Sequence, residues 1–332
     1  MAKSKITTQL IAGFAATMSL AGAGFEFGWP SPSLPKLLAP DSSIHVTPDE
    51  GSWIVSVFTI GCAFGSFIGA AFVDRCGRKW LLLSTVIPHL IASILIGAAQ
   101  NVWWFIFARI IAGLGTGIAF AIVPMYAGEI ADDRIRGAVS GMLDPVVNVS
   151  VVITYSVGPW VSPEALAGVG GILPLIFGLM FICMPESPYF SVINDKPHQA
   201  EKSLMWLRGR SDVADELRMI QESVESGRNN RGTVRELITI PGNRKALIII
   251  VGLMAAQQFS GVSSLAYSSL IFRASGSSLD SSISVIIVGV VQILAGVLTV
   301  FIVDLVGRRL LLLISTCGSI FFLVGRISIF SP

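Results

Sequence analysis

The sequence is poor in charged residues and in cysteine. Charged residues make up 13% of its 332 residues. This is about half of the roughly 25% that is usual in a soluble domain. Its four cysteines, which are Cys62, Cys76, Cys183 and Cys317, lie in apolar runs or in one short basic loop and form no CxxC pair. The low charge excludes an ordinary soluble domain, and the cysteine spacing predicts neither a disulfide framework nor a metal site.

Patterns typical of enzymes are also absent from the sequence. It has no Walker loop, no HExxH pattern and no Ser/His/Asp arrangement, so ATP is not expected to drive its function. The GLGTG stretch from Gly113 to Gly117 is interpreted as a surface of small residues for helix packing. We therefore expect a protein that is not an enzyme and has neither a cofactor nor a nucleic-acid partner. A membrane enzyme is the most distant function considered.

Long hydrophobic runs dominate what is present. Hydrophobic residues make up 53% of the chain, and runs of about 20 such residues cross a lipid bilayer as helices. The first run follows Lys3 and Lys5 and lacks a cleavage site of small residues, so we interpret it as a spanning helix. The sequence thus predicts an all-α membrane protein with spans near 8–29, 53–73, 80–99, 102–127, 138–160, 165–184, 245–272, 282–303 and 309–329.

Basic residues fall in alternate loops, which predicts the orientation of the chain. The opposite loops have only Lys36 and Arg273 and carry the acidic stretch DSSIHVTPDE. Because basic loops stay inside, the N-terminus and the polar segment 186–244 are expected in the cytoplasm. Two amphipathic stretches of that segment, AEKSLMWLRG and VADELRMIQESVES, predict short helices at the membrane surface.

Two loops repeat each other. DRCGRK (74–79) follows the second span, and DLVGRR (304–309) follows the eighth. Duplicated halves are typical of transporters. The sequence therefore predicts a six-helix transmembrane half over 1–184 and a cytoplasmic linker with short helices over 185–244. An incomplete second half of about three helices is expected over 245–332, so the chain is interpreted as truncated.

Five motifs in order resemble the sugar porter family of the major facilitator superfamily. They are DRCGRK, RIIAGLGTG with VPMYAGEIADDRIRG, PESP, QQFSGVSSLAYSS and DLVGRR, and together they cover nearly the whole chain. Asn148 and the stretch GWPSPSLPKL are similar to the insect facilitated trehalose transporters within that family. The resemblance implies the major facilitator fold in the plasma membrane and sugar transport by alternating access.

The resemblance implies that Gln257 and Gln258 in the seventh span contact the sugar. Amides donate and accept hydrogen bonds, which suits a ligand rich in hydroxyl groups. The alternative is that these amides join neighbouring helices. The Ser260–Gly261 pair after them is expected to bend or open the helix. Ser263 stands where the family usually has asparagine, which loosens any inference about the particular sugar.

Asp144 in the fifth span aligns with a glutamine that contacts substrate in the family. It precedes Pro145, where a kink is expected. An ionisable group at this depth is a candidate substrate contact, together with Asn148, although capping around the kink is a competing interpretation.

Nine charged residues lie at the predicted cytoplasmic ends of the helices. In the family that the sequence resembles, such charges latch the two halves together in the outward-open state. The alternative is that they are ordinary positive-inside anchors. The residues are Asp74, Arg75, Arg78, Glu129, Arg134, Arg136, Asp304, Arg308 and Arg309.

Glu26 ends the uncharged run QLIAGFAATMSLAGA, where a carboxylate is costly to desolvate. At 1.5 Å per residue its depth agrees with that of Arg109 within about 5 Å, so we hypothesise a buried ion pair. Glu26 falls where proton-coupled members of the family carry aspartate. The pair either couples proton uptake to transport or is static, and a static pair is preferred because ion-pair networks also arise without coupling. His89 is expected to be a packing residue.

The sequence therefore predicts a facilitative sugar transporter for trehalose or a hexose. One alternative is a proton-coupled sugar symporter that uses Glu26 and Arg109. The other is a truncated paralogue or sensor that binds sugar or partners without transporting them.

Overall fold

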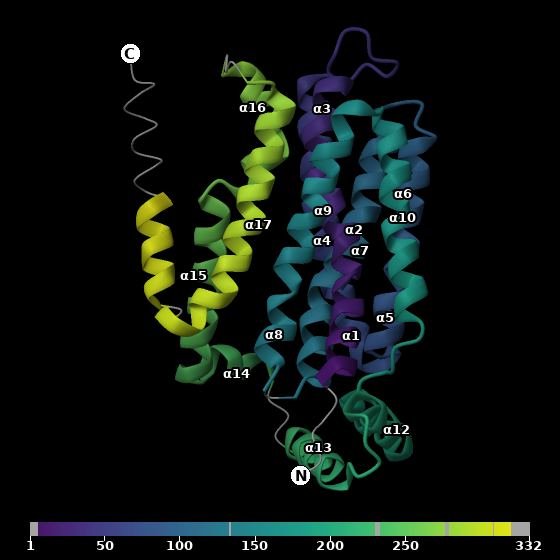
Figure 1. The fold of residues 1–332 in the computed structure, drawn as a ribbon, viewed down its shortest axis with the longest axis vertical. Coiled ribbons are helices and arrows are strands. Elements are labelled where there is room, and N and C mark those ends of the chain that lie inside the picture. Colours follow the sequence, from purple (N-terminus) through teal and green to yellow (C-terminus); the bar gives the residue numbers. More distant parts are fainter. Residues whose placement is uncertain (1–5, 133, 230–232, 276–278, 308, 320–332) are drawn as a thin grey trace. The chain divides into compact units, whose positions relative to one another are not determined.

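The computed structural model describes residues 6–132, 134–229, 233–275, 279–307 and 309–319. Within these residues every regular element is a helix (Figure 1). In chain order they are α1 (Ile6–Thr17), α2 (Ser19–Gly28), α3 (Pro30–Leu37), α4 (Pro48–Cys76), α5 (Arg78–Ser84), α6 (Val86–Gly97), α7 (Val102–Ile130), α8 (Arg136–Gly141), α9 (Leu143–Val157), η1 (Gly158–Trp160), α10 (Pro163–Phe181), α11 (Pro188–Ile193), α12 (Pro197–Arg208), α13 (Ala214–Asn229), α14 (Val234–Thr239), α15 (Pro241–Phe259), η2 (Val262–Tyr267), α16 (Ser268–Ala274) and α17 (Ser281–Val306).

Eight helical stretches of the described chain are long and apolar enough to cross a bilayer. They are Ile6–Leu37, Pro48–Cys76, Arg78–Gly97, Val102–Ile130, Arg136–Trp160, Pro163–Phe181, Pro241–Ala274 and Ser281–Thr299. They coincide with the first eight predicted spans, so the prediction of an all-α membrane protein is confirmed. The predicted ninth span begins with the shorter apolar helix Arg309–Ser319 and continues outside the described residues.

The chain divides into two compact units. The first comprises Met1–Arg231 and Ala266–Val290, and the second comprises Gly232–Leu265 and Val291–Pro332. The boundary runs through η2 and α17, so it does not coincide with any border of the three predicted segments. The division into 1–184, 185–244 and 245–332 stays a prediction.

The first span is longer than predicted and continues through the proline-rich stretch to Leu37. Pro30 at the start of α3 has no N–H, so the Glu26 carbonyl four residues earlier has no backbone donor in the helix. The Ser33 N–H donates to the Trp29 carbonyl and so continues the helix across the junction. Lys36 Nζ then ties the end of α3 to the end of α9 by donating to the carbonyl oxygens of Gly158 (2.7 Å), Pro159 (2.9 Å) and Val161 (2.5 Å).

Helices α4 and α7 approach each other through glycine. A Cβ atom built on Gly117 of α7 would clash with the carbonyl oxygen of Cys62, and one on Gly61 of α4 would clash with that of Ile110. Because lipid chains are as apolar as side chains, close packing of this kind is what holds membrane helices together. The interpretation of GLGTG as a packing surface is therefore confirmed.

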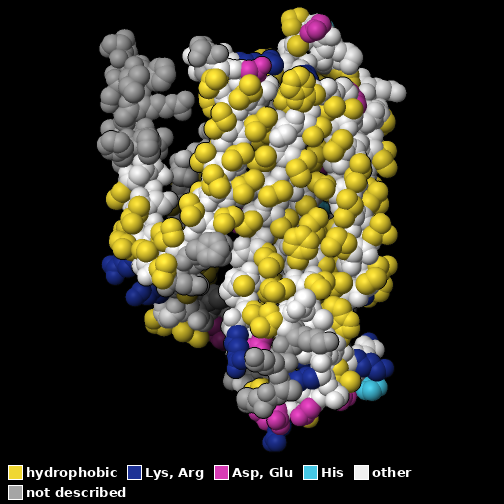
Figure 2. All heavy atoms as spheres, in the orientation of Figure 1, with side chains coloured by type: hydrophobic (Ala, Val, Ile, Leu, Met, Phe, Trp, Pro, Cys, Tyr) yellow, Lys and Arg dark blue, Asp and Glu magenta, His cyan; other side chains and the backbone are white. Residues whose placement is uncertain are grey.

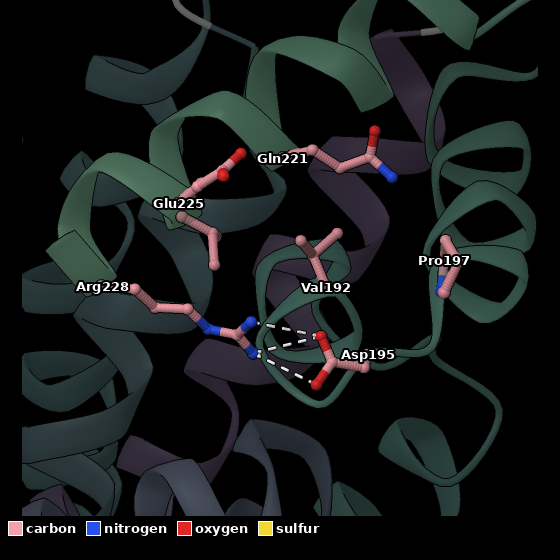
Figure 3. A pocket seen from close by; sticks show the side chains of 7 residues that line it. Val192, Asp195, Pro197, Gln221, Glu225 and Arg228 are labelled. Atoms are coloured by element: carbon pink, nitrogen blue, oxygen red, sulfur yellow. Dashed lines mark hydrogen bonds and ion pairs between the residues drawn. The ribbon is translucent and has the colours of Figure 1, made fainter.

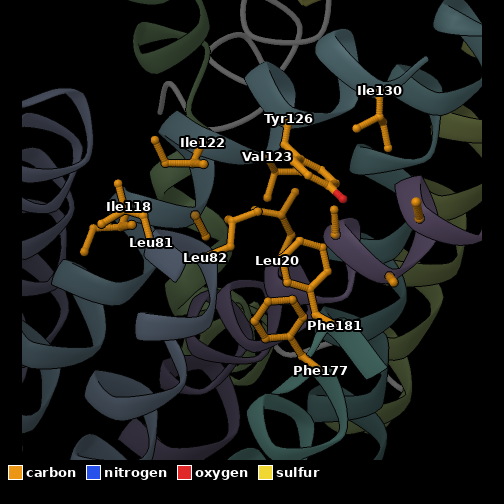
Figure 4. Close-up of a cluster of buried hydrophobic side chains, with 14 of the residues drawn as sticks. Leu20, Leu81, Leu82, Ile118, Ile122, Val123, Tyr126, Ile130, Phe177 and Phe181 are labelled. Carbon is orange, nitrogen blue, oxygen red and sulfur yellow. The ribbon is translucent and has the colours of Figure 1, made fainter. Parts of the chain in front are cut away.

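Large apolar side chains fill one end of the first unit (Figure 4). The rings of Phe177 and Phe181 are stacked with their centroids 5.2 Å apart, and Tyr126 meets Phe181 edge-on at 5.3 Å. The Tyr126 hydroxyl donates to the Pro185 carbonyl at 2.8 Å, which satisfies its polar group. Leu207 of α12 is buried in the same cluster, so the helices that follow the sixth span pack onto the spanning helices.

Helices α11, α12 and α13 pack on one another through Val192, Leu204 and Ile220, which are all buried. Part of their apolar surface is therefore covered by protein, and their predicted place at the membrane surface stays a prediction. Over the spanning helices of the first unit, by contrast, apolar side chains cover the outer surface (Figure 2). Phe67 and Leu179 are both 76% exposed there, as is expected of side chains that face acyl chains.

The glycine packing predicts opposite effects for two substitutions in α7. Gly117→Ala places a methyl group against the Cys62 carbonyl and is expected to lower the unfolding midpoint in detergent, since overpacking costs about 1–3 kcal/mol. Gly128→Ala is the matched control, because a Cβ atom there meets no atom within 4 Å. It should leave the midpoint unchanged or raise it. Equal midpoints for Gly117→Ala and the unmodified chain would contradict the close approach.

Candidate functional site

Glu26 of α2 and Arg109 of α7 lie in direct contact inside the first unit. Arg109 Nη1 donates to Glu26 Oε2 at 2.7 Å and to the Glu26 carbonyl oxygen at 2.9 Å. Arg109 Nε donates to the Ile54 carbonyl at 3.3 Å. The Arg109 side chain is 1% exposed and the Glu26 side chain is 6% exposed. The structure therefore brings together the two residues that the sequence analysis hypothesised to pair.

Aromatic rings cover the rest of the Arg109 guanidinium. Its central carbon lies 4.2 Å from the centroid of the Phe58 ring and 5.7 Å from that of Trp29. A guanidinium is weakly hydrated and favours such ring faces. With three acceptors and two rings around it, Arg109 is held in one position by α2, α4 and its own helix.

A second charged cluster lies at the end of the unit where α1 begins. Arg78 Nε donates to both Glu129 oxygens at 3.0 and 3.2 Å, and Arg78 Nη2 donates to Oε1 at 2.9 Å. Arg78 Nη1 also donates to Asp74 at 3.1 Å. Arg78 is buried, whereas the Asp74 side chain is 67% exposed. These ion pairs join α4, α5 and α7 within the first unit, and the predicted role of the three residues in a latch between halves stays a prediction.

The PESP motif completes this cluster. Ser187 Oγ donates to Glu129 Oε2. The Glu186 carboxylate accepts from the backbone N–H groups of Arg78 (3.1 Å), Lys79 (3.1 Å) and Ser187 (2.8 Å), and so caps the N-terminus of α5. Burial raises the pKa of Glu186, while these N–H groups and the Arg78 charge act in the opposite direction.

Gly77 of the DRCGRK motif lies directly against the Glu186 carboxylate. Its φ is 90°, in the region that favours glycine, and a Cβ atom there would clash with Glu186 Oε2. Gly307 of DLVGRR has a φ of 83°, so the glycine of each repeated loop has a positive φ. Sequence analysis missed the role of Glu186 because its contact with Arg78 joins residues 108 positions apart. The available signal was an acidic residue in one loop and a glycine in another loop predicted on the same side of the membrane.

Gln257 and Gln258 are exposed near the end of α15, in the second unit. The predicted opening of the helix is confirmed, because α15 ends at Phe259 and Gly261 follows with a φ of 91°. Ser263 lies in η2 and is also exposed. Their predicted contact with substrate stays a prediction.

Asp144 and Asn148 are brought together at the start of α9. Asn148 Nδ2 donates to the carbonyl oxygen and to Oδ2 of Asp144, both at 3.1 Å. The helix is interrupted at Met142, three residues before Pro145, whose missing N–H weakens the turn. Asp144 is exposed and Asn148 is half-buried. These bonds lie within one turn of α9 and do not involve the Gly141 carbonyl that Pro145 leaves without a donor. The predicted contact with substrate and the competing capping interpretation both stay predictions.

Six of the nine predicted cytoplasmic charges do not belong to the Arg78 cluster, and one of these six lies outside the described residues. Arg75, Arg134, Arg136 and Arg309 are exposed. Asp304 lies in the last turn of α17. Arg308, the remaining member of the nine, falls outside the described residues, as do Lys3 and Lys5.

His89 is buried, with Nδ1 2.7 Å from the Thr85 carbonyl and Nε2 3.3 Å from Thr116 Oγ1. Both ring nitrogens have partners on α7 or on the preceding turn. This geometry matches a packing residue.

A hollow lies among α11, α12 and α13 (Figure 3). Arg228 Nη1 and Nη2 both donate to Asp195 Oδ1 at 3.2 Å across it. The other lining residues are Val192, Pro197, Gln221, Val224 and Glu225. None of the five residues predicted to contact substrate is among them.

The sequence of the chain is similar to those of known transporters. The family model described as Sugar (and other) transporter matches residues 25–330. The facilitated trehalose transporter Tret1 of Polypedilum vanderplanki is 32% identical over 324 residues, which cover 96% of this chain and 64% of that protein. Tret1 of Anopheles gambiae is 32% identical over 323 residues, which cover 96% of this chain and 41% of that protein. The chain thus spans less than two thirds of the length of these relatives.

Solved structures share the fold. The proton:xylose symporter XylE bound to 6-bromo-6-deoxy-D-glucose aligns with a TM-score of 0.76 at 23% identity, covering 91% of this chain and 70% of that chain. A partially occluded inward-open form of XylE from E. coli aligns with a TM-score of 0.72 at 22% identity, covering 90% and 74%. This likeness shows the fold alone and confirms the predicted major facilitator architecture. Since the family model covers all but the ends of the chain, the protein belongs to the sugar transporter family.

Proposed function

We propose that this chain transports a sugar, trehalose or a hexose, across the plasma membrane by alternating access. The transport is facilitative and uses neither ATP nor a cofactor. The observation that supports the proposal most is the family-model match from residue 25 to residue 330. The similarity to facilitated trehalose transporters favours trehalose within this class.

The sugar contact is proposed for Gln257 and Gln258, assisted by Ser263, Asp144 and Asn148. The glutamines come just before the break at Gly261, where the chain leaves the α-helical conformation. Interrupted spanning helices expose backbone groups and polar side chains, which is how transporters of several folds build their substrate sites. Exposed amides on a spanning helix are costly against acyl chains, which supports a polar partner for them.

A static role is proposed for the ion pair of Glu26 and Arg109. Arg109 is fixed by two backbone carbonyls and two aromatic rings in addition to the carboxylate. A proton carrier has to lose its partner in each cycle, whereas this arrangement holds three helices in register. Proton symport, as named for XylE, is the alternative that a pH gradient distinguishes.

The charges at the end where α1 begins are proposed to form the latch that opens and closes during transport. Arg78 already has two carboxylate partners of different exposure, Glu129 and Asp74. The pair of Arg78 with the exposed Asp74 contributes modestly and breaks readily, whereas the pair with Glu129 is nearly buried. The basic loops at the same end support a cytoplasmic N-terminus.

The transport proposal is tested in proteoliposomes that contain the full chain. We expect radiolabelled trehalose to equilibrate across the membrane without accumulating when the outside is made acidic. Binding without uptake would support the non-transporting sensor, and accumulation that follows the pH gradient would support symport.

Substitution of the ion pair separates a static role from a proton-coupling role. Glu26→Gln leaves a buried guanidinium without its counter-charge, so we expect about 3–5 kcal/mol of destabilisation. Replacing both members, as in Glu26→Leu/Arg109→Met, should recover most of the lost thermal stability, since an apolar replacement of a buried pair is often neutral. A static pair is contradicted if Glu26→Gln keeps its stability and loses only the response to a pH gradient.

Removal of an amide tests the sugar contact. Gln257→Ala or Gln258→Ala is expected to weaken sugar affinity by about 10-fold or more, because an unpaired hydroxyl of the sugar costs about 1–3 kcal/mol. Gln221→Ala in α13 is the control outside the spans and should bind as the unmodified chain does. If both single variants and the double variant bind sugar normally, the assignment fails.

The orientation is tested by cysteine labelling in cells. Cys76 is exposed after the second span, so an impermeant maleimide should label it only after permeabilisation. His45→Cys in the opposite loop, combined with Cys76→Ser, should be labelled in intact cells. The reverse pattern would place the N-terminus outside.

A further inference from the structure

Helix α12 is attached to the spanning helices by its last turn. The Leu207 carbonyl accepts a hydrogen bond from Thr8 Oγ1, in the first turn of α1, at 2.8 Å. Arg208 Nη1 donates to the carbonyl of Ile130, the last residue of α7, at 2.9 Å. The end of α12 is therefore fixed at the level where α1 begins and α7 ends, which is the edge of the apolar region.

Trp206 is left uncovered by this attachment. Its side chain is 39% exposed, whereas the neighbouring Leu207 is fully buried. Lys202 is exposed one turn earlier on the same stripe of the helix. At about 100° per residue, the acidic Glu201 lies about 140° around the helix from Trp206. The stripe is therefore basic and aromatic, without an acidic side chain on it.

Arg210 follows two residues after the end of α12, beyond the left-handed turn at Gly209. Its side chain is 32% exposed, and Nη2 lies 3.7 Å from Glu216. Its Nε is buried and has no hydrogen-bond partner among the described residues. A buried donor without a partner costs free energy, so this guanidinium is suited to a further anionic ligand.

Trp80 of α5 has similar surroundings at the same end of the unit. It is 61% exposed and precedes Leu81, which is buried in the same cluster as Leu207. Lys79 Nζ lies 5.8 Å from the centroid of its ring. Tryptophan is enriched where hydrocarbon meets water, and basic residues near that boundary attract anionic headgroups.

We propose that Lys202, Trp206 and Arg210 bind the headgroup and upper acyl region of an anionic phospholipid. Trp206 enters the boundary between headgroup and acyl chain, and the two basic side chains bind the phosphate. The site lies on the linker, away from the residues proposed to contact sugar. Because α12 also contacts α1 and α7, a lipid bound at this site would link the negative charge of the membrane leaflet to those contacts.

Quenching of tryptophan fluorescence by brominated lipid measures this contact directly. The full chain is placed in nanodiscs that contain brominated phosphatidylserine or brominated phosphatidylcholine, and the signal of Trp206 is taken as the difference between the unmodified chain and Trp206→Phe. We expect phosphatidylserine to quench Trp206 at a lower mole fraction than phosphatidylcholine does. In Lys202→Gln/Arg210→Gln the preference should fall by about 25-fold, because each basic residue contributes roughly fivefold.

Arg218→Gln is the matched control, because Arg218 is exposed on α13 and pairs with Glu222 away from the stripe. It should keep the preference. Absence of quenching at Trp206, or an equal preference in the double variant and the unmodified chain, would overturn the proposal. Both leaflets of the nanodisc have one composition, so the outcome depends neither on orientation nor on transport.

Discussion

The guanidinium of Arg109 has to be satisfied inside the protein, because neither lipid nor bulk water reaches it. Its partners come from α2 and α4, so one charged side chain sets the distance of two helices from α7. The glycines that bring α4 against α7 make this geometry accessible. Removing either Glu26 or Arg109 alone leaves the other charge buried and unpaired, which destabilises the fold strongly. The packing around the pair stabilises the fold through many small contacts.

Helix α7 is the common element of the described contacts in the first unit. At its middle Thr116 meets His89 of α6, and towards its end Glu129 binds Arg78 of α5. Its last carbonyl binds Arg208 of α12. In a bilayer, where apolar surface gives little reason to associate, such polar contacts and close backbone approaches decide which helices are neighbours.

The sequence predicted the spanning helices well because a bilayer imposes one length and one composition on each. The stretch to Leu37 was missed because three prolines argue locally against a helix. It is held by distant contacts, among them the bonds of Lys36 to three carbonyls and the burial of Leu34 and Leu37. The depth of Glu26 and Arg109 was predictable from helix rise. The capping role of Glu186 was not, because nothing near it in the sequence indicates a partner 108 residues away. For Gln257 and Gln258 the sequence indicates side chains that both donate and accept hydrogen bonds. Their contact with sugar stays a prediction.

The contact between Glu186 and the start of α5 has a mechanical consequence. Glu186, in the loop after the sixth span, accepts hydrogen bonds from the first N–H groups of the third span. Gly77 lies directly against its carboxylate, where a Cβ atom would clash. The end of the sixth span is therefore linked to the start of the third span. A displacement of Glu186 would therefore either move the start of the third span with it or break these hydrogen bonds.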